Sequence, residues 1–142
     1  MWLVELPTYI GGWSSFYARS ATLAGVEQDD DGIVPESLDE VAARTKAKLL
    51  YVIPNFQNPS GRLMTQARRR AVLELAKKHD FLVIEDDPYG EPVYVDGADT
   101  TPITSAADDG RISHLRPCSK AIAPGLRRGW DLAAPRTARD VE

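Results

Sequence analysis

One lysine of the sequence stands where its amine could take part in covalent chemistry. Lys120 follows Ser119 at the end of an expected strand and precedes a constraining Ala-Ile-Ala-Pro-Gly segment. Desolvation and cationic neighbours lower the pKa of a lysine, and its neutral amine can then form an imine. Arg127 is near enough in sequence to clamp an anion at the same place. The alternatives are a solvated charge for Lys120 and a surface salt bridge for Arg127.

A carboxylate and a phenol are spaced so that they could face the same crevice. Asp86 follows a run of apolar residues, with Asp87 beside it, and Tyr89 comes three residues after Asp86. A carboxylate at the end of a buried strand requires a cationic or hydrogen-bonding partner, which favours a role for the pair of aspartates. A solvated acidic loop or a helix cap, with Tyr89 as an ordinary core tyrosine, is the structural alternative.

A polar turn forms the third candidate. Residues 58–61 read Asn-Pro-Ser-Gly, a composition typical of tight turns. Turn formation alone explains these residues, so Asn58 is a weak functional candidate when it is taken by itself.

The elements that must position these groups follow from the hydrophobic pattern. Residues 49–53 and 81–84 are short, nearly all-apolar runs, which predict strands buried on both faces. Residues 65–79 between them have helical periodicity, with Thr65 as N-cap. The predicted buried stripe contains Val72, Leu73, Leu75 and Ala76, and the predicted wet face contains Arg68, Arg69, Arg70, Glu74, Lys77 and Lys78.

A strand, a helix and a strand with short joints form a crossover unit, which predicts an α/β fold with a mainly parallel sheet. The other predicted strands are residues 2–5, 22–26, 112–116 and 129–134, and the other predicted helices are residues 12–19 and 35–47. Residues 28–32 are expected to form a solvated turn, and residues 96–110 a polar connection. Ligands of such sheets bind beyond the carboxyl ends of the strands, where all three candidates fall.

Composition excludes several other classes of protein. The 142 residues carry 17 basic and 21 acidic side chains, with both signs scattered, which argues against a nucleic-acid-binding surface. Cys118 is the one cysteine, which excludes an internal disulfide and a multi-cysteine metal site, so no metal is expected. No apolar run approaches the roughly 20 residues that span a bilayer. We therefore expect no membrane association and a cytoplasmic protein.

Four segments together resemble one family. They are Pro-Thr-Tyr at 7–9, Pro-Asn-Phe-Gln-Asn-Pro-Ser-Gly at 54–61, Glu-Asp-Asp-Pro-Tyr at 85–89, and Ser-Lys-x-x-x-Pro-Gly-Leu-Arg at 119–127. In this order and spacing they resemble the class I/II aminotransferases of fold type I, which use pyridoxal 5'-phosphate (PLP). Within that family the segments are most similar to the 2-aminoadipate and kynurenine aminotransferases.

The resemblance implies a role for each matching residue. Lys120 matches the amine that forms an imine with PLP and then moves the proton at the substrate Cα, and Asp86 matches the carboxylate that pairs with the pyridinium nitrogen. The other implied cofactor contacts are Asn58 and Tyr89 to the phenolic oxygen, Tyr9 to the ring face, and Ser119 and Arg127 to the phosphate. The implied catalytic residues are thus Lys120, Asp86 and Tyr89.

The resemblance also implies the organisation of the protein. Residues 1–142 would form part of a three-layer α/β/α large domain, without the N-terminal phosphate-loop region and the C-terminal small domain. The implied substrates are an amino acid and a 2-keto acid, and the implied full-length form is a homodimer.

Departures from the family pattern leave two alternatives open. Pro117 and Cys118 replace a phosphate-binding hydroxyl and an aromatic residue, Arg128 replaces an apolar residue, and Asp131 places a charge in an expected buried strand. One alternative is a truncated, inactive aminotransferase-like chain. The other is the aminotransferase-like domain of a GntR-type transcriptional regulator, although such regulators commonly have tyrosine at the position of Asn58.

Overall fold

The computed structural model describes residues 1–90, 96–126 and 128–134. The strands are β1 (Trp2–Leu6), β2 (Leu23–Asp29), β3 (Gly32–Ile33), β4 (Leu49–Val52), β5 (Leu82–Asp86), β6 (Ile112–Pro117) and β7 (Gly129–Leu132). The α-helices are α1 (Ile10–Ala18), α2 (Pro35–Thr45), α3 (Gln66–His79) and α4 (Cys118–Ala121), and short 3-10 helices are η1 (Ile103–Ala106) and η2 (Pro124–Leu126).

The strands form a single sheet in the order β3-β2-β1-β4-β5-β6-β7. The five inner strands are parallel, and β3 and β7 pair antiparallel at the two edges. The chain passes from β1 to β2 on one side and later to β4 on the other side of β1. In open α/β sheets such a reversal opens a crevice at the carboxyl ends of the strands. The prediction of a mainly parallel α/β sheet is confirmed.

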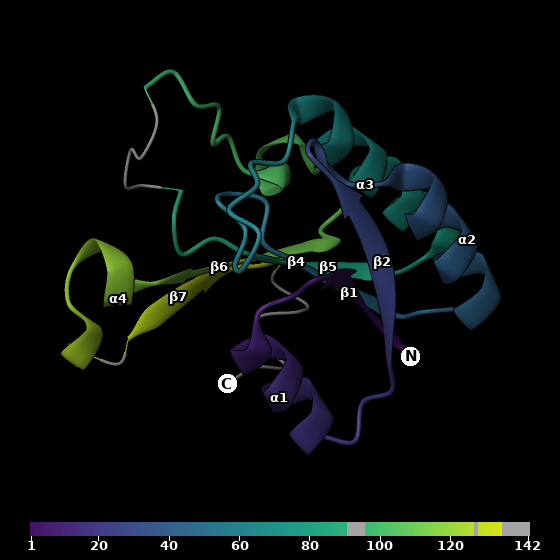
Figure 1. Ribbon diagram of the computed structural model, residues 1–142, viewed down its shortest axis with the longest axis horizontal. Helices are drawn as coiled ribbons and strands as arrows, with labels where there is room; N and C mark the ends of the chain where they lie inside the picture. Colours follow the sequence, from purple (N-terminus) through teal and green to yellow (C-terminus); the bar gives the residue numbers. More distant parts are fainter. Residues whose placement is uncertain (91–95, 127, 135–142) are drawn as a thin grey trace.

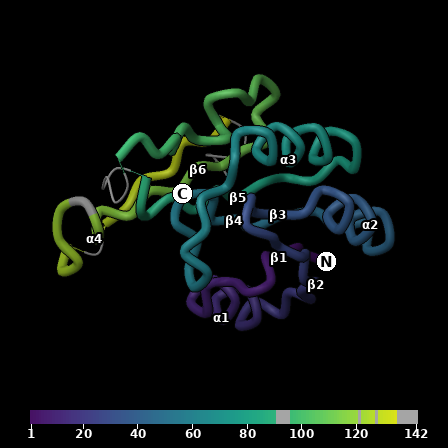
Figure 2. The backbone as a smooth tube through the Cα atoms, turned by 45° about the horizontal axis from the view of Figure 1, so that its top comes forward, coloured from purple at the N-terminus to yellow at the C-terminus, as the bar shows by residue number. Residues whose placement is uncertain are grey.

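Helices cover both faces of this sheet. Figure 1 shows α2 and α3 on one face and α1 on the opposite face, while α4 lies beside β7 at one end. The turned view of Figure 2 keeps this arrangement, with the sheet between the two helical layers. The predicted three-layer arrangement is therefore present. In the described part of the chain no helix is both long and apolar enough to cross a membrane.

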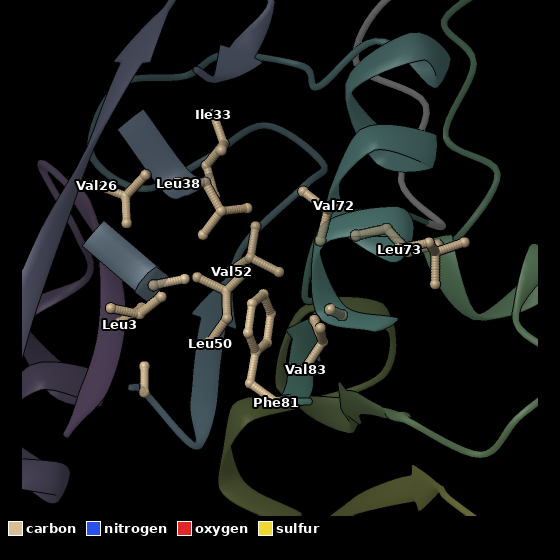
Figure 3. Packing of buried hydrophobic residues seen from close by; sticks show 14 of the residues in the cluster. Leu3, Val26, Ile33, Leu38, Leu50, Val52, Val72, Leu73, Phe81 and Val83 are labelled. Atoms are coloured by element: carbon tan, nitrogen blue, oxygen red, sulfur yellow. The ribbon is translucent and has the colours of Figure 1, made fainter. Parts of the chain in front are cut away.

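Successive residues of a strand point to opposite faces of the sheet, so the strands contribute to two separate hydrophobic clusters. Leu3, Leu50 and Val83 join the larger cluster under α2 and α3, and Phe81 packs among them in Figure 3. Val4, Tyr51 and Ile53 form the smaller cluster on the face of α1. Burial on both faces explains why the central strands are almost continuously apolar.

Helix α3 has the predicted bounds and cap, but one residue of its wet face is buried. The Thr65 hydroxyl accepts from the backbone N–H of Arg68 at 3.4 Å, and the helix ends at His79. The prediction that Arg69 is solvated is wrong, since its side chain is only 2 % exposed. Its guanidinium donates to the carbonyl oxygens of Met64 (3.0 Å), Thr101 (3.0 Å) and Pro54 (3.2 Å), and to Asn55 Oδ1 (2.8 Å).

Two predicted loops contain regular structure. The solvated turn predicted at residues 28–32 is confirmed only at exposed Asp30 and Asp31, because Gln28 and Asp29 end β2 and Gly32 begins β3. The two strands close a short hairpin, which the positive φ of Gly32 (106°) permits. Within the 96–110 connection, η1 is anchored by buried Glu85, which accepts from the backbone N–H groups of Ile103 (2.7 Å) and Thr104 (3.1 Å).

A buried glutamate joins the carboxyl ends of β1 and β4. Glu5 is 1 % exposed, and its Oε2 accepts from the backbone N–H of Ile53 at 2.9 Å and from the Gln57 amide at 3.4 Å. Burial raises the pKa of Glu5 from 4.5 to about 8, although both hydrogen bonds oppose the rise. The carboxyl group is therefore neutral over most of the acidic and neutral pH range.

Substitution of Arg69 by methionine should destabilise the chain by roughly 3 kcal/mol, because the buried carbonyl oxygens would lose their donor. The midpoint of urea unfolding measures this loss. Arg70→Met is the matched control, since Arg70 is exposed on the same helix. Equal midpoints for the two variants would contradict the structural role of Arg69.

The stability of the chain should fall as the pH rises from about 4.5 to about 8, because folded Glu5 retains a proton that the unfolded chain has released. Glu5→Gln removes this titration. The loss of unfolding free energy between pH 5 and pH 8 should therefore shrink by on the order of 3 kcal/mol. Urea unfolding at both pH values tests the prediction, with exposed Glu74→Gln as control. An unchanged slope in Glu5→Gln would show that Glu5 is ionised in the fold.

Candidate functional site

A cavity of about 690 Å³ lies at the carboxyl ends of the central strands. Residues that follow β1, β4, β5 and β6 all contribute to its wall. Six of the seven site residues predicted from the sequence line it. These six are Tyr9, Asn58, Asp86, Tyr89, Ser119 and Lys120. The seventh, Arg127, lies outside the described residues. Parallel pairing thus brings groups from four distant segments to one place.

The β1 end supplies an aromatic ring. Tyr9 is the N-cap residue of α1 and is 40 % exposed. A Cβ on Gly11 would come within 2.5 Å of this ring, so the glycine permits the ring to fold over the start of the helix. The carbonyl oxygen of Pro7, two residues earlier, accepts from the side-chain amides of Gln28 and Gln57, each at 2.8 Å.

The β4 end supplies Asn58 on a turn that Gln57 organises. The Oε1 atom of Gln57 accepts from the backbone N–H (2.8 Å) and the hydroxyl (2.6 Å) of Ser60, while its amide reaches Pro7 and Glu5. Gln57 is 2 % exposed. It therefore ties the Asn58 turn to the segment that carries Tyr9. Gln57 is not among the residues predicted from the sequence, because a glutamine in a turn has no distinctive spacing.

The β5 end supplies the carboxylate of Asp86. Its Oδ2 accepts from the Tyr51 hydroxyl at 2.5 Å. Burial raises the pKa of Asp86, and the hydrogen bond from Tyr51 opposes that rise. Asp86 lines the cavity, and Tyr51 of β4 is the hydrogen-bonding partner that a carboxylate at this place requires.

Asp87 belongs to a separate buried network. Its Oδ1 accepts from Asn55 at 2.8 Å, and its Oδ2 lies 3.4 Å from both His114 Nε2 and Arg116 Nε. Burial alone would raise the pKa of Asp87, but His114, Asn55 and Arg116 lower it below its usual value. His114 also lies 3.7 Å from Glu85. Strand alternation from buried Ile112 could have indicated that His114 points inward.

The β6 end supplies Ser119 and Lys120 on the short helix α4. The backbone N–H of Cys118 donates to the Arg128 carbonyl oxygen at 2.9 Å, which holds the start of this helix against the chain entering β7. The Lys120 side chain is exposed. The desolvation expected from the sequence is therefore not provided here, whereas cationic neighbours, Arg116 and Arg128, do line the same cavity.

The charge of Asp131 causes no burial penalty in this structure. The residues of β7 are all exposed, and Asp131 Oδ1 accepts from the Ser113 hydroxyl at 2.7 Å. The expectation of a buried β7 is wrong here, because β7 is an edge strand that, among the described strands, pairs with β6 alone.

The cavity combines groups suited to a polar aromatic ligand. Lys120, Arg116 and Arg128 provide cations, and Asp86 provides a half-buried anion. Tyr9 and Tyr89 provide aromatic rings, and Ser119 and Asn58 provide hydrogen-bonding groups. Such a wall can bind a flat ring with an anionic substituent and a protonated nitrogen. Among the described residues no three His, Cys, Asp or Glu side chains are grouped to hold a metal ion.

Comparison with known proteins identifies relatives along nearly the whole chain. The family model for aminotransferase class I and II matches residues 15–141. The chain is 39 % identical to aromatic-amino-acid aminotransferase 1 of Thermococcus litoralis, covering 99 % of this chain and 34 % of the relative. It is 35 % identical to YisV of Bacillus subtilis, an uncharacterised regulator of the helix-turn-helix type, covering 94 % of this chain and 27 % of that protein.

The fold has equally similar counterparts among solved structures. Kynurenine aminotransferase of Pyrococcus horikoshii superposes with a TM-score of 0.92 at 37 % identity, covering 98 % of this chain and 35 % of that one. The chain thus spans about a third of the length of these enzymes. Because the family model matches most of its residues, the chain belongs to the class I and II aminotransferase family.

Proposed function

We propose that the protein to which this chain belongs catalyses PLP-dependent transamination between an amino acid and a 2-keto acid. The observation that carries the proposal is the convergence of six family-matching residues, from four segments of the sequence, on one cavity. Family membership and the solved structure of an aminotransferase with a TM-score of 0.92 support the same conclusion.

The residues of the cavity fit PLP group by group. We assign the stacking contact to Tyr9 and the pairing with the ring nitrogen to Asp86, whose hydrogen bond from Tyr51 favours the ionised carboxylate. Asn58 and Tyr89 would donate to the phenolic oxygen of the ring. Ser119 would bind the phosphate, and we assign a second phosphate contact to Arg127 on the family pattern alone.

Each residue would then have a simple task. PLP, when bound, supplies an electron sink for the charge that develops on the substrate Cα. Lys120 would hold the cofactor covalently and, once released, carry a proton to and from the substrate Cα. Asp86 would keep the ring nitrogen protonated. Tyr9 would hold the ring flat against one wall of the cavity.

We also propose the substrate class, the domain organisation and the assembly of the protein. We infer a substrate of the 2-aminoadipate or aromatic class with broad specificity, on the strength of relatives named for aromatic amino acids and kynurenine. We also infer that residues 1–142 form part of the large domain, and that the phosphate-loop region and small domain are contributed from outside them. A full-length homodimer and a cytoplasmic location complete the proposal.

Lys120→Ala should abolish covalent attachment of PLP. The side-chain nitrogen of Lys120 is the atom that would bond the cofactor, and no other lysine is among the described residues that line the cavity. Incubation with PLP, borohydride reduction and peptide mass spectrometry should place the cofactor mass on Lys120 in the unchanged chain and nowhere in the variant. Visible absorbance of the bound cofactor should be lost in parallel.

Lys48→Ala is the matched control, because Lys48 is exposed at the amino end of β4, whereas the cavity lies at the carboxyl ends of the strands. It should retain the PLP adduct. An adduct on another lysine, or full labelling of Lys120→Ala, would refute the assignment. If a longer protein containing this chain is labelled and the 142-residue chain is not, the partial-domain proposal is supported. If neither is labelled, the inactive alternative holds.

A regulatory domain is the second candidate, because YisV is 35 % identical over 94 % of this chain. Asn58 favours the enzyme, since it stands in the cavity where regulators commonly have tyrosine. Single-turnover conversion of an amino acid to its keto acid distinguishes the two. A sensor would bind PLP and amino acid without releasing a keto acid, whereas the enzyme releases it stoichiometrically.

A further inference from the structure

We propose that Tyr51 is a positioning residue for the site, whose buried hydroxyl fixes one oxygen of Asp86 so that the other oxygen is presented to the protonated ring nitrogen of the ligand. This inference rests on the proposed function and adds a residue that lies outside the cavity lining.

The hydroxyl of Tyr51 is placed by the strand pairing itself. Tyr51 lies in β4 opposite Ile84 of the neighbouring strand β5, two residues before Asp86. Its side chain is 3 % exposed, and its hydroxyl lies 2.5 Å from Asp86 Oδ2. A single contact between adjacent strands thus sets the position of the carboxylate at the cavity wall.

The ring of Tyr51 is held on the face covered by α1. The ring of Phe16 packs edge-on against it, with centroids 5.1 Å apart and an interplanar angle of 73°. Phe16 is itself packed edge-on by Trp2, with ring centroids 5.0 Å apart. A Cβ on Gly12 would come within 2.9 Å of the Tyr51 ring, so glycine there leaves room for it. The hydroxyl therefore has little freedom to turn away from Asp86.

The direction of the hydrogen bond follows from the environment of the two groups. Burial and the negative charge of Asp86 raise the pKa of Tyr51 above its usual range, so the phenol keeps its proton and donates. Burial also raises the pKa of Asp86, and the nearby charge of Asp87 adds to this. Tyr51 and His114 act in the opposite direction. Tyr51 is the group that bonds Asp86 directly.

The two adjacent aspartates are consequently held by different partners. Asp87 is bound by Asn55 and approached by His114 and Arg116, whereas Asp86 is bound by Tyr51. The arrangement leaves Asp86, and not Asp87, as the carboxylate with an oxygen available at the ring position. A hydrogen bond to an ionised carboxylate is stronger than one to a neutral carboxyl group, so Tyr51 would favour ionised Asp86 and its ion pair with the ring nitrogen.

Tyr51→Phe tests the inference, since the ring and its packing are kept and only the hydroxyl is lost. In the chain without ligand, the pKa of Asp86 followed by carboxyl ¹³C NMR should rise by about one unit, because a hydrogen bond to the charged form has gone. The dissociation constant of PLP should increase roughly tenfold. The ¹⁵N shift of labelled PLP should move towards the deprotonated ring nitrogen.

Tyr17→Phe is the matched control, because Tyr17 is 67 % exposed and stacks only on Trp13 in the described structure. It should leave all three measurements unchanged. Should Tyr51→Phe unfold, fluorinated tyrosine at position 51 provides the second test, since a more acidic phenol should lower the pKa of Asp86. Unchanged Asp86 pKa in either Tyr51 variant would overturn the inference. If Tyr51→Phe raises the pKa of Asp86, but neither this chain nor a longer protein that contains it binds PLP, the proposed function is overturned. The hydrogen bond from Tyr51 to Asp86 is still supported in that case.

Discussion

Parallel hydrogen bonding between neighbouring strands is the constraint on which the rest of this structure depends. Because β1, β4, β5 and β6 run in the same direction, their carboxyl ends meet at one rim of the sheet. Each strand is followed by one of the polar segments, so residues from position 9 to position 120 of the chain reach a single cavity. The reversal of strand order at β1 opens the rim where a ligand can enter.

Several buried polar side chains lie at this rim, and they find hydrogen-bonding partners on both faces of the sheet. On the face of α1, Tyr51 binds Asp86. On the face of α3, Arg69 and Asn55 bridge the loops after β4 to the 96–110 connection, and Glu85 anchors η1. Glu5, in β1, accepts from Ile53 and Gln57, and burial favours its neutral form. Each of these side chains therefore has a hydrogen-bonding partner on a neighbouring strand or loop.

The cavity is unevenly enclosed by the described residues. Its wall near Asp86 is made by central strands and is half-buried, whereas Lys120 and the whole of β7 are exposed. The chain spans about a third of the length of its relatives. The central strands enclose the cavity at Asp86, whereas the described residues leave its wall at Lys120 and β7 open.

The sequence by itself determined the strands, the helices and the residues that meet at the rim, because hydrophobic periodicity and the end of each strand are local properties. It therefore predicted Asp86, Tyr89 and Lys120 together. Only the tertiary structure decided which partner each polar group has. Arg69 looked solvated by helical spacing, yet its guanidinium lies among carbonyl oxygens of two loops, the one after β4 and the 96–110 connection. Tyr51 looked like one more residue of an apolar strand, and its hydroxyl became significant only when β4 paired with β5, since a contact between residues 35 apart has no local signature.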